Sequence, residues 1–355
     1  MKEIVLFKNI RRIFLLLVLL LSPSCKQHPS DITAVCELMP DATYSLKWET
    51  FPPIEGVVKI FESSNPDSFP ATPVYEENIA SKYKTVLATP RTRSFFRLVF
   101  NKRQSIIVAN RIIPMHGIPN FRDFGGYFTR DNRQIRWGRL FRSGSFSGAT
   151  AHDAYLLKML RLKTFIDFRT EQEHRYYPNR IQPAQVYNLP LKGSEPDTFF
   201  DEILSKRTSA ANILTYDYNT TALLLENNSE YFAKMFDVLL DENNYPVCLS
   251  CFAGKDRSAL AAALVLLALG VDEETVLEDY MLSNQYIDYG SLVWFADALA
   301  DDMQESITAL YSSHEETLRN IFNILKKDGS INIYLEKKLK LTPKKREQLQ
   351  KILLY

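Results

Sequence analysis

The sequence predicts two folded units, a small β-sandwich over residues 32–112 and an α/β domain over residues 113–355. Two observations support this division. The chain of 355 residues is longer than one average hydrophobic core requires. The first part has short strand patterns broken by prolines, whereas the second alternates apolar strands with helical segments. We therefore expect a central parallel-type sheet flanked by helices in the second unit.

The composition is that of an ordinary globular protein, with 46% hydrophobic and 24% charged residues. The 43 basic and 42 acidic residues nearly cancel. A nucleic-acid-binding protein usually has a basic excess, so we expect no nucleic-acid partner. The five histidines are widely scattered and none pairs at metal-ligand spacing. We therefore expect neither a metal nor another cofactor.

The N-terminus is typical of a targeting signal. Four basic residues precede an apolar run, Ile13–Leu21, of nine residues. A bilayer span needs about 20 residues, so this run is too short. The order of basic, apolar and small residues before Cys25 resembles a bacterial lipoprotein signal. That resemblance implies a signal over residues 1–24, lipidation of Cys25 and a tether over residues 25–31. A plain secretory signal and an uncleaved anchor are the alternatives.

The predicted location follows from that resemblance. A lipidated Cys25 would hold the protein at a membrane of the cell envelope, on the periplasmic or the outer-surface face. The lipid anchor would be its contact with the membrane.

The first unit, residues 32–112, carries strand signals. They lie at Tyr44–Trp48, Val57–Phe61, Phe95–Phe100 and Ser105–Asn110. Five prolines between residues 52 and 73 argue against helices. The layout resembles a fibronectin type III-like domain. No catalytic pattern occurs here, so we expect a spacer or docking module, whose partner the sequence does not identify.

The second unit, residues 113–355, alternates strands and helices. Strands are expected over Lys163–Arg169 and Tyr245–Ser250. Helices are expected over Ser258–Gly270, Thr275–Leu282, Ser291–Ala300 and Glu315–Lys327, and a last one begins at Pro343 after Thr342.

The most informative segment, VCLSCFAGKDRSALAAALVLL at residues 247–267, predicts a strand, a tight loop and a helix. Cys251 and Arg257 are separated by five residues in it. Such a loop can direct backbone N–H groups at phosphoryl oxygens, and the helix adds its positive N-terminal end. Small Ala253 and Gly254 let the backbone close tightly. The planar fork of Arg257 can bind two oxygens.

The same environment would stabilise the thiolate of Cys251 at neutral pH. Attack of the thiolate on phosphorus would give a phosphocysteine, which water then hydrolyses. Ser258 is placed to donate a hydrogen bond to the sulfur. We therefore predict Cys251 as the nucleophile. The predicted phosphate-binding residues are Phe252, Ala253, Gly254, Lys255, Asp256, Arg257 and Ser258. The alternative is that Cys251 is an ordinary buried cysteine and Arg257 an ordinary helical arginine, and that they occur at this spacing by chance.

Several motifs point to one family. CFAGKDRS resembles the loop of bacterial tyrosine and lipid phosphatases with a Cys-x-x-Gly-Lys-Asp-Arg signature, within the Cys-x5-Arg protein tyrosine phosphatase superfamily. NFRDFGGY (Asn120–Tyr127), LFRSG (Leu140–Gly144), IDFRTEQE (Ile166–Glu173) and Gly329–Thr342 resemble further motifs of that family, in the same order. The resemblance covers about residues 115–355 and implies a metal-free phosphomonoester hydrolase.

The resemblance also suggests substrates. Members act on phosphotyrosine and, in some cases, on phosphoserine, phosphothreonine or phosphoinositides, so we expect a phosphorylated protein or a phosphoinositide as substrate. Lys255 and Asp256 are the residues associated with this broad range, because an extra cation would favour highly charged head groups.

One position departs from the family pattern. The family usually has histidine before the catalytic cysteine, where this chain has Ser250. Serine can still form hydrogen bonds, so we expect reduced or shifted activity. A phospho-ligand-binding pseudophosphatase and an adhesion or scaffold lipoprotein remain the alternatives.

Three carboxyl groups are candidates for the general acid that protonates the leaving oxygen. The resemblance implies Asp256, within the loop. Asp167, at a strand end, is the second candidate, and a structural ion pair with Arg142 or Arg169 is its alternative role. Asp217 is the third, because it lies at the distance of the mobile acid loop in other tyrosine phosphatases.

Other residues have mainly structural interpretations. Arg122 and Asp123 are expected to hold the early motif against the loop. Tyr216 and Tyr218 are expected either in a substrate lid or as surface aromatics. The basic run Lys337–Arg346 is expected to be a solvated helix face.

Overall fold

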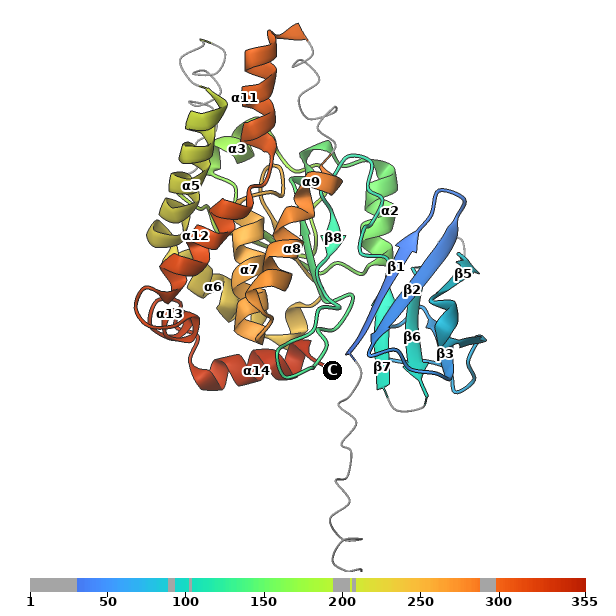
Figure 1. The fold of residues 1–355 in the computed structure, drawn as a ribbon. Coiled ribbons are helices and arrows are strands. Elements are labelled where there is room, and N and C mark those ends of the chain that lie inside the picture. The colour runs from blue at the N-terminus through green and yellow to red at the C-terminus, as the bar shows by residue number, and fades with distance from the viewer. Residues whose placement is uncertain (1–30, 89–92, 102–103, 194–204, 206–208, 288–297) are drawn as a thin grey trace, which may run out of the picture.

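The structure is a computed structural model that describes residues 31–355 except 89–92, 102–103, 194–204, 206–208 and 288–297. Figure 1 shows the blue and cyan sandwich beside a larger domain of sheet and helices. The predicted signal, Cys25 and most of the predicted helix Ser291–Ala300 lie outside the described residues. Within the described ranges, none of the helices combines the length and the apolar character that a membrane span needs.

Seven strands form the N-terminal sandwich. They are β1 (Asp31–Leu38), β2 (Thr43–Phe51), β3 (Val57–Ser63), β4 (Tyr75–Asn78), β5 (Tyr83–Leu87), β6 (Phe95–Phe100) and β7 (Gln104–Ala109). One antiparallel sheet has the order β1-β2-β5 and the other β4-β3-β6-β7. Their inner faces enclose an apolar core around Trp48, whose indole N–H donates to the Ile79 carbonyl at 2.8 Å. The four predicted strands are confirmed.

A five-stranded sheet forms the centre of the second unit. Its strands are β8 (Arg122–Asp123), β9 (Leu140–Ser143), β10 (Thr164–Asp167), β11 (Gln185–Asn188) and β12 (Val247–Ser250). The order is β11-β10-β12-β9-β8, with β8 antiparallel to β9 and the other neighbours parallel. Register places Ser143, Ser250 and Asp167 level with one another. The carboxyl ends of three strands therefore form one edge, where α/β proteins place their ligands.

Helices surround this sheet. They are α2 (Ala151–Met159), α3 (Glu171–Tyr176), α5 (Ala210–Asn227), α6 (Ser229–Leu239), α7 (Arg257–Leu269), α8 (Glu273–Met281), α9 (Ser283–Tyr286), α11 (Asp301–Tyr311), α12 (Glu315–Lys326), α13 (Ile331–Lys337) and α14 (Pro343–Leu353). Short 3-10 segments lie at Ile79–Ser81, Phe146–Gly148 and Glu242–Asn244. The predicted helices that fall within the described residues are confirmed as α7, α8, α12 and α14.

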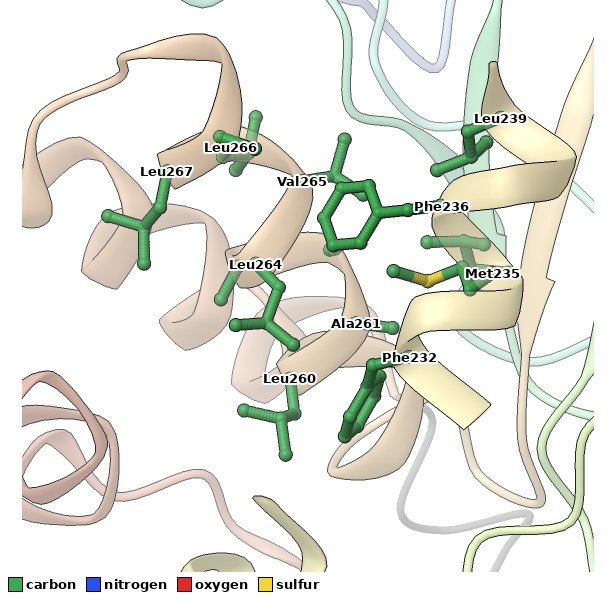
Figure 2. Close-up of a cluster of buried hydrophobic side chains, with 14 of the residues drawn as sticks. Phe232, Met235, Phe236, Leu239, Leu260, Ala261, Leu264, Val265, Leu266 and Leu267 are labelled. Carbon is green, nitrogen blue, oxygen red and sulfur yellow. The ribbon is translucent and has the colours of Figure 1, made fainter. Parts of the chain in front are cut away.

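Helix α7 is buried along its whole length. Figure 2 shows Phe232 and Phe236 of α6 facing Leu264 and Val265 of α7. A helix that is apolar on all sides must be enclosed by other elements, so its position is strongly determined. Gly270 ends it as the C-cap, with φ +99°. This packing fixes the N-terminus of α7 next to the end of β12.

The sandwich is docked on the second unit by polar side chains. The side-chain amide of Gln134 donates to the Ile107 carbonyl at 2.7 Å and accepts from the Ile107 amide at 3.1 Å, as a neighbouring strand would. Arg93 forms a 2.8 Å ion pair with buried Asp123. Asp123 thereby links the sandwich to the NFRDFGGY motif, a structural role that differs from the expected one of holding this motif against the phosphate loop.

Candidate active site

Residues 251–256 connect β12 to α7, so Cys251 directly follows the central strand and Arg257 begins the helix. Cys251 and Arg257 are each 3% exposed. The sulfur of Cys251 lies 3.5 Å from the hydroxyl of Ser258, the second residue of α7. The structure therefore brings together the predicted nucleophile, the predicted arginine and the serine.

The loop carbonyls are bound from outside by two motif residues. Asn120 Nδ2 donates to the Gly254 carbonyl at 2.8 Å. Arg142 Nη2 donates to the carbonyls of Gly254 and Lys255, at 3.0 and 3.3 Å. In a trans peptide the N–H points opposite to the C=O. The amides of Lys255 and Asp256 consequently face the inside of the loop.

The other loop amides are available for an anion. The Phe252 carbonyl is also bound from outside, by the amide of Ser145 at 2.9 Å. In the described part of the chain, the amides of Phe252, Ala253 and Gly254 have no hydrogen-bond acceptor. Together with the N-terminus of α7, these amides can bind three oxygens of a phosphoryl group.

Gly254 permits the close approach of this loop to β9. Its φ is +77°, and a Cβ added there would lie 2.5 Å from the Gly144 amide nitrogen. Any larger residue would therefore displace either the loop or the end of β9.

Arg257 is held by Glu173 of α3. The two guanidinium nitrogens lie 2.5 and 2.6 Å from the two carboxylate oxygens. Glu173 also accepts from the Thr170 amide at 2.7 Å, in a capping box at the start of α3. Burial alone would lower the pKa of Arg257, but the hydrogen bonds with Glu173 and the nearby Cys251 raise it above its ordinary value. The arginine is therefore charged and oriented.

Lys255 has a different environment from Arg257. Its ammonium donates to the carbonyls of Leu310 and Ser312, at 2.9 Å each, at the end of α11. It also lies 3.2 Å from Asp256 Oδ1 and 3.9 Å from Asp217 Oδ1. The Lys255 side chain is 4% exposed. The charge that was expected to favour charged head groups is thus offset by two carboxyl groups of the protein.

The three candidates for the general acid are placed differently. Asp256 has one buried oxygen, yet its side chain is 33% exposed. Burial raises the pKa of Asp256; Lys255 opposes this shift and Asp217 adds to it. Asp217 lies in helix α5 rather than in a loop, and accepts a 2.7 Å hydrogen bond from the Thr317 hydroxyl. The expectation of a mobile loop at Asp217 is therefore wrong, although Asp217 does lie near the phosphate loop.

Asp167 is paired with Arg169, which is the structural ion pair expected as the alternative to a role as general acid. Three nitrogen–oxygen distances between them are 2.9 to 3.1 Å, and both side chains are fully buried. Asn179 donates to the same carboxylate at 3.2 Å. These contacts give Asp167 a structural role at the end of β10.

A buried aspartate on α8 supports the two motif arginines. Asp279 lies 2.7 Å from Arg142 and 3.7 Å from Arg122, and accepts from the Tyr127 hydroxyl at 3.0 Å. Burial would raise the pKa of Asp279, but the charges of Arg122 and Arg142 lower it. Arg122 in turn binds Asn120. The expected structural role of Arg122 is therefore confirmed, whereas the roles of Asn120, Glu173 and Asp279 were not predicted.

The two neighbouring cysteines differ sharply. Cys248 is fully buried, and this burial raises its pKa to about 12. It lies within β12, 3.3 Å from the Ser143 hydroxyl, and both cysteines are free. Cys248 is thus a core residue. Ser250, between them, donates to the Gly144 carbonyl at 2.7 Å.

Aromatic side chains lie at the mouth of the loop. Tyr177 is half exposed and meets Phe252 edge-on, with ring centroids 5.2 Å apart. Tyr218 is 42% exposed on α5, as a surface aromatic residue. The basic run Lys337–Arg346 is mostly exposed on α13 and α14, as expected of a solvated face.

The chain is similar to several known proteins. A tyrosine-protein phosphatase, so named in Cupriavidus necator, is 30% identical over 173 residues, which are 47% of this chain and 61% of that protein. The triple specificity protein phosphatase PtpB of Mycobacterium tuberculosis is 27% identical over 194 residues, 48% of this chain and 68% of PtpB. A solved structure of the catalytic domain of the PP-IP phosphatase SIW14 from S. cerevisiae is 16% identical, with TM-score 0.26, over 53% of this chain and 87% of that one.

The profile of the tyrosine phosphatase family matches residues 113–355. This range contains β8 to β12, the phosphate loop and every helix that holds it, and it excludes the sandwich. The chain therefore belongs to the tyrosine phosphatase family, a family of hydrolases.

Proposed function

We propose that this protein hydrolyses phosphomonoesters through a phosphocysteine formed on Cys251. The observation that carries the proposal is the convergence of the Cys251 sulfur, the loop amides and the Arg257 guanidinium at the start of α7. A thiolate next to a preformed anion site is the arrangement that phosphoryl transfer to sulfur requires.

In the first step, the thiolate attacks phosphorus, an S–P bond forms and the bond to the leaving oxygen breaks. Asp256 donates its proton to that oxygen, because its partly exposed carboxyl lies in the loop itself. In the second step, water attacks phosphorus, the S–P bond breaks and Asp256 recovers a proton. Ser258 donates a hydrogen bond to the departing sulfur, and inorganic phosphate leaves.

The loop binds the charge that develops in both steps. The inward-facing amides and Arg257 contact the nonbridging oxygens of the phosphoryl group that is transferred, while Glu173 keeps the guanidinium fork in place. Asn120 and Arg142 hold the loop carbonyls outward. No step in this mechanism requires a metal.

Phosphotyrosine is the substrate group that the site supports best. The edge-on pair of Tyr177 and Phe252 gives the mouth an aromatic wall, against which a phenyl ring can pack. The names of the two sequence relatives are consistent with this choice, and the triple specificity of PtpB supports testing phosphoserine, phosphothreonine and phosphoinositides as well.

A phosphate-binding pseudophosphatase is the second candidate, and Ser250 is the observation that favours it. The Ser250 hydroxyl donates to Gly144, a residue of the neighbouring strand end, rather than to the sulfur. Such a protein would keep the anion site and lack turnover.

The location is a separate proposal. We infer that Cys25 is lipidated after cleavage of residues 1–24, which would anchor the protein in the cell envelope. The order of basic, apolar and small residues before Cys25 supports this inference. Mass spectrometry of the mature protein should find a lipidated N-terminal Cys25; an unmodified N-terminus at another residue would contradict it.

Phosphate release separates the two functions. The chain is incubated with an aryl phosphate in excess chelator, and Cys251→Ser serves as the matched variant. We expect release by the wild-type protein in the presence of chelator and none by the variant, since a serine hydroxyl has no accessible anion near neutral pH. Vanadate binding without phosphate release in either protein would establish the pseudophosphatase instead.

A further inference from the structure

A buried polar cluster lies behind the phosphate loop. It contains Lys255 and Asp256 of the loop, Asp217 of α5 and Thr317 of α12. The catalytic steps proposed above use Asp256 but give no role to the other three. Resting on that proposed function, we propose that Asp217 is a positioning residue that keeps the transferable proton on Asp256.

The Lys255 ammonium lies between two backbone carbonyls and two carboxyl groups. The carbonyls of Leu310 and Ser312 each accept from it at 2.9 Å. Two carboxyl groups also lie close to this ammonium, Asp256 at 3.2 Å and Asp217 at 3.9 Å.

Two ionised carboxylates can share one buried cation only at a cost in free energy. Like charges in a site of low dielectric constant disfavour each other, so one of the two groups holds its proton. The two groups then form a coupled pair with one proton between them, comparable to other carboxyl pairs that serve in acid catalysis.

The surroundings of Asp217 and Asp256 decide which of the two is protonated. Asp217 is 8% exposed, and its carboxyl group already accepts a 2.7 Å hydrogen bond from the Thr317 hydroxyl. Asp256 Oδ1 is buried, and within the described residues it has no hydrogen-bond donor with good geometry. An ionised oxygen in that position is poorly solvated. The proton therefore stays on Asp256.

The groups that face Asp256 from neighbouring elements agree with this assignment. They are Lys255 beside it, Arg257 at the start of α7, Asp217 on α5 and Tyr280 on α8. Burial raises the pKa of Tyr280 well above its ordinary value, so Tyr280 is neutral. Burial raises the pKa of Asp256, the two cations oppose the shift and Asp217 reinforces it.

The exposed part of Asp256 explains why it acts and Asp217 does not. One-third of the Asp256 side chain is accessible, in the loop that binds the phosphoryl group. Asp217 is only 8% exposed and lies 3.9 Å from the Lys255 ammonium. Lys255 thus has a positional function: it connects α11, α5 and the loop.

The test is the pH dependence of kcat/KM for Asp217→Asn with an alkyl phosphate, whose poor leaving group needs the acid. Removal of the like charge should lower the pH at which Asp256 loses its proton. The basic limb of the profile should then move to lower pH by about one unit or more. Lys255→Met should move the same limb to higher pH, because it removes the cation that favours ionised Asp256.

Two further variants keep the test decisive. Thr317→Val removes the hydrogen bond to Asp217 without changing charge, and should move the limb in the same direction as Asp217→Asn but less far. Thr221→Val, at a buried residue one turn further along α5, is the matched control and should leave the limb in place. With an aryl phosphate that has a good leaving group, the shifts should largely disappear, since little protonation is needed.

An active Asp217→Asn protein whose basic limb is unmoved, or moves upward, would overturn the inference while leaving the proposed hydrolysis intact. If Asp217→Asn does not fold, an unmoved limb in Thr317→Val and Lys255→Met would overturn it equally. Absence of hydrolysis in the wild-type protein would instead overturn the proposed function on which the inference rests.

Discussion

Arg257 and Lys255 lie two residues apart in one loop, yet the structure uses their charges differently. The fork of Arg257 is bound by Glu173 on α3 at the mouth of the loop. The ammonium of Lys255 is turned to the end of α11 and lies between Asp217 and Asp256. The two side chains are equally buried, but Arg257 is held by a carboxylate and Lys255 by backbone carbonyls as well as carboxyl groups. Proximity in a motif therefore does not imply a shared function.

The largest effect is expected at Arg257. Replacement Arg257→Lys retains the positive charge but loses the planar fork that binds two phosphoryl oxygens and Glu173. We expect kcat/KM to fall about 100- to 1,000-fold, as for the loss of an oxyanion donor. Inhibition by vanadate should weaken as well. Near-normal kinetics in the variant would show that Arg257 is not the phosphate-binding residue.

Glu173→Gln tests the carboxylate side of the ion pair between Arg257 and Glu173. Loss of a charged hydrogen-bond partner should reduce kcat/KM about 10- to 100-fold, from about 1.5–3 kcal/mol per such interaction. Steady-state kinetics on an aryl phosphate measure this directly. An unchanged kcat/KM would mean that the guanidinium is oriented without Glu173.

Glu173→Gln should also change how the free energy of unfolding depends on pH. Burial would raise the pKa of Glu173, but the hydrogen bonds from Arg257 lower it below its ordinary value. Its stabilising contribution is therefore present above the ordinary glutamate pKa of about 4.3 and is lost as pH falls through the lower folded value. Urea unfolding of both proteins should show a difference at pH 7 that shrinks in acid. A constant difference would contradict the ion pair.

Lys255→Met sharpens the comparison by separating binding from proton transfer. Because the ammonium is bound within the protein, its removal should leave the vanadate inhibition constant within about two- to threefold. Arg257→Lys, by contrast, should weaken vanadate inhibition by more than this. A loss of vanadate affinity in Lys255→Met equal to that in Arg257→Lys would show that both cations bind phosphate.

The smallest effect is expected at Ser250, which contacts neither cation. Ser250→His restores the residue typical of the family and should move the acidic limb of kcat/KM to lower pH, or raise the rate modestly, if the ring is accommodated. Thiol alkylation of Cys251 as a function of pH provides an independent measurement. If both curves are unchanged in a folded variant, the serine does not limit activity.

The sequence predicts the phosphate loop well because its determinants are local. Cys251, Gly254, Arg257 and the C-cap Gly270 lie on one strand, loop and helix, and each has a requirement that nearby residues reveal. The buried helix α7 is equally apparent, since its residues are apolar on every side. The alternation of apolar and polar residues in β2, β3, β6 and β7 is likewise a local signal.

The supporting contacts could not be predicted because they join distant segments. Glu173 and Arg257 are 84 residues apart, and Arg142 and Asp279 are 137 apart. The capping box Thr170-x-x-Glu173 was a visible local signal for α3, but nothing in it indicates the arginine partner. Asp217 is a candidate acid from its spacing alone, and its position in a helix that packs against α11 and α12 is not apparent from that spacing.

The central claim, a covalent phosphocysteine on Cys251, is tested most directly by trapping the intermediate. The wild-type protein is mixed with an aryl phosphate carrying labelled phosphorus, quenched within the first turnover and digested for mass spectrometry. We predict label on the peptide that contains Cys251, and neither label nor turnover in Cys251→Ser. Label on a different residue, or undiminished turnover in Cys251→Ser, would contradict the mechanism.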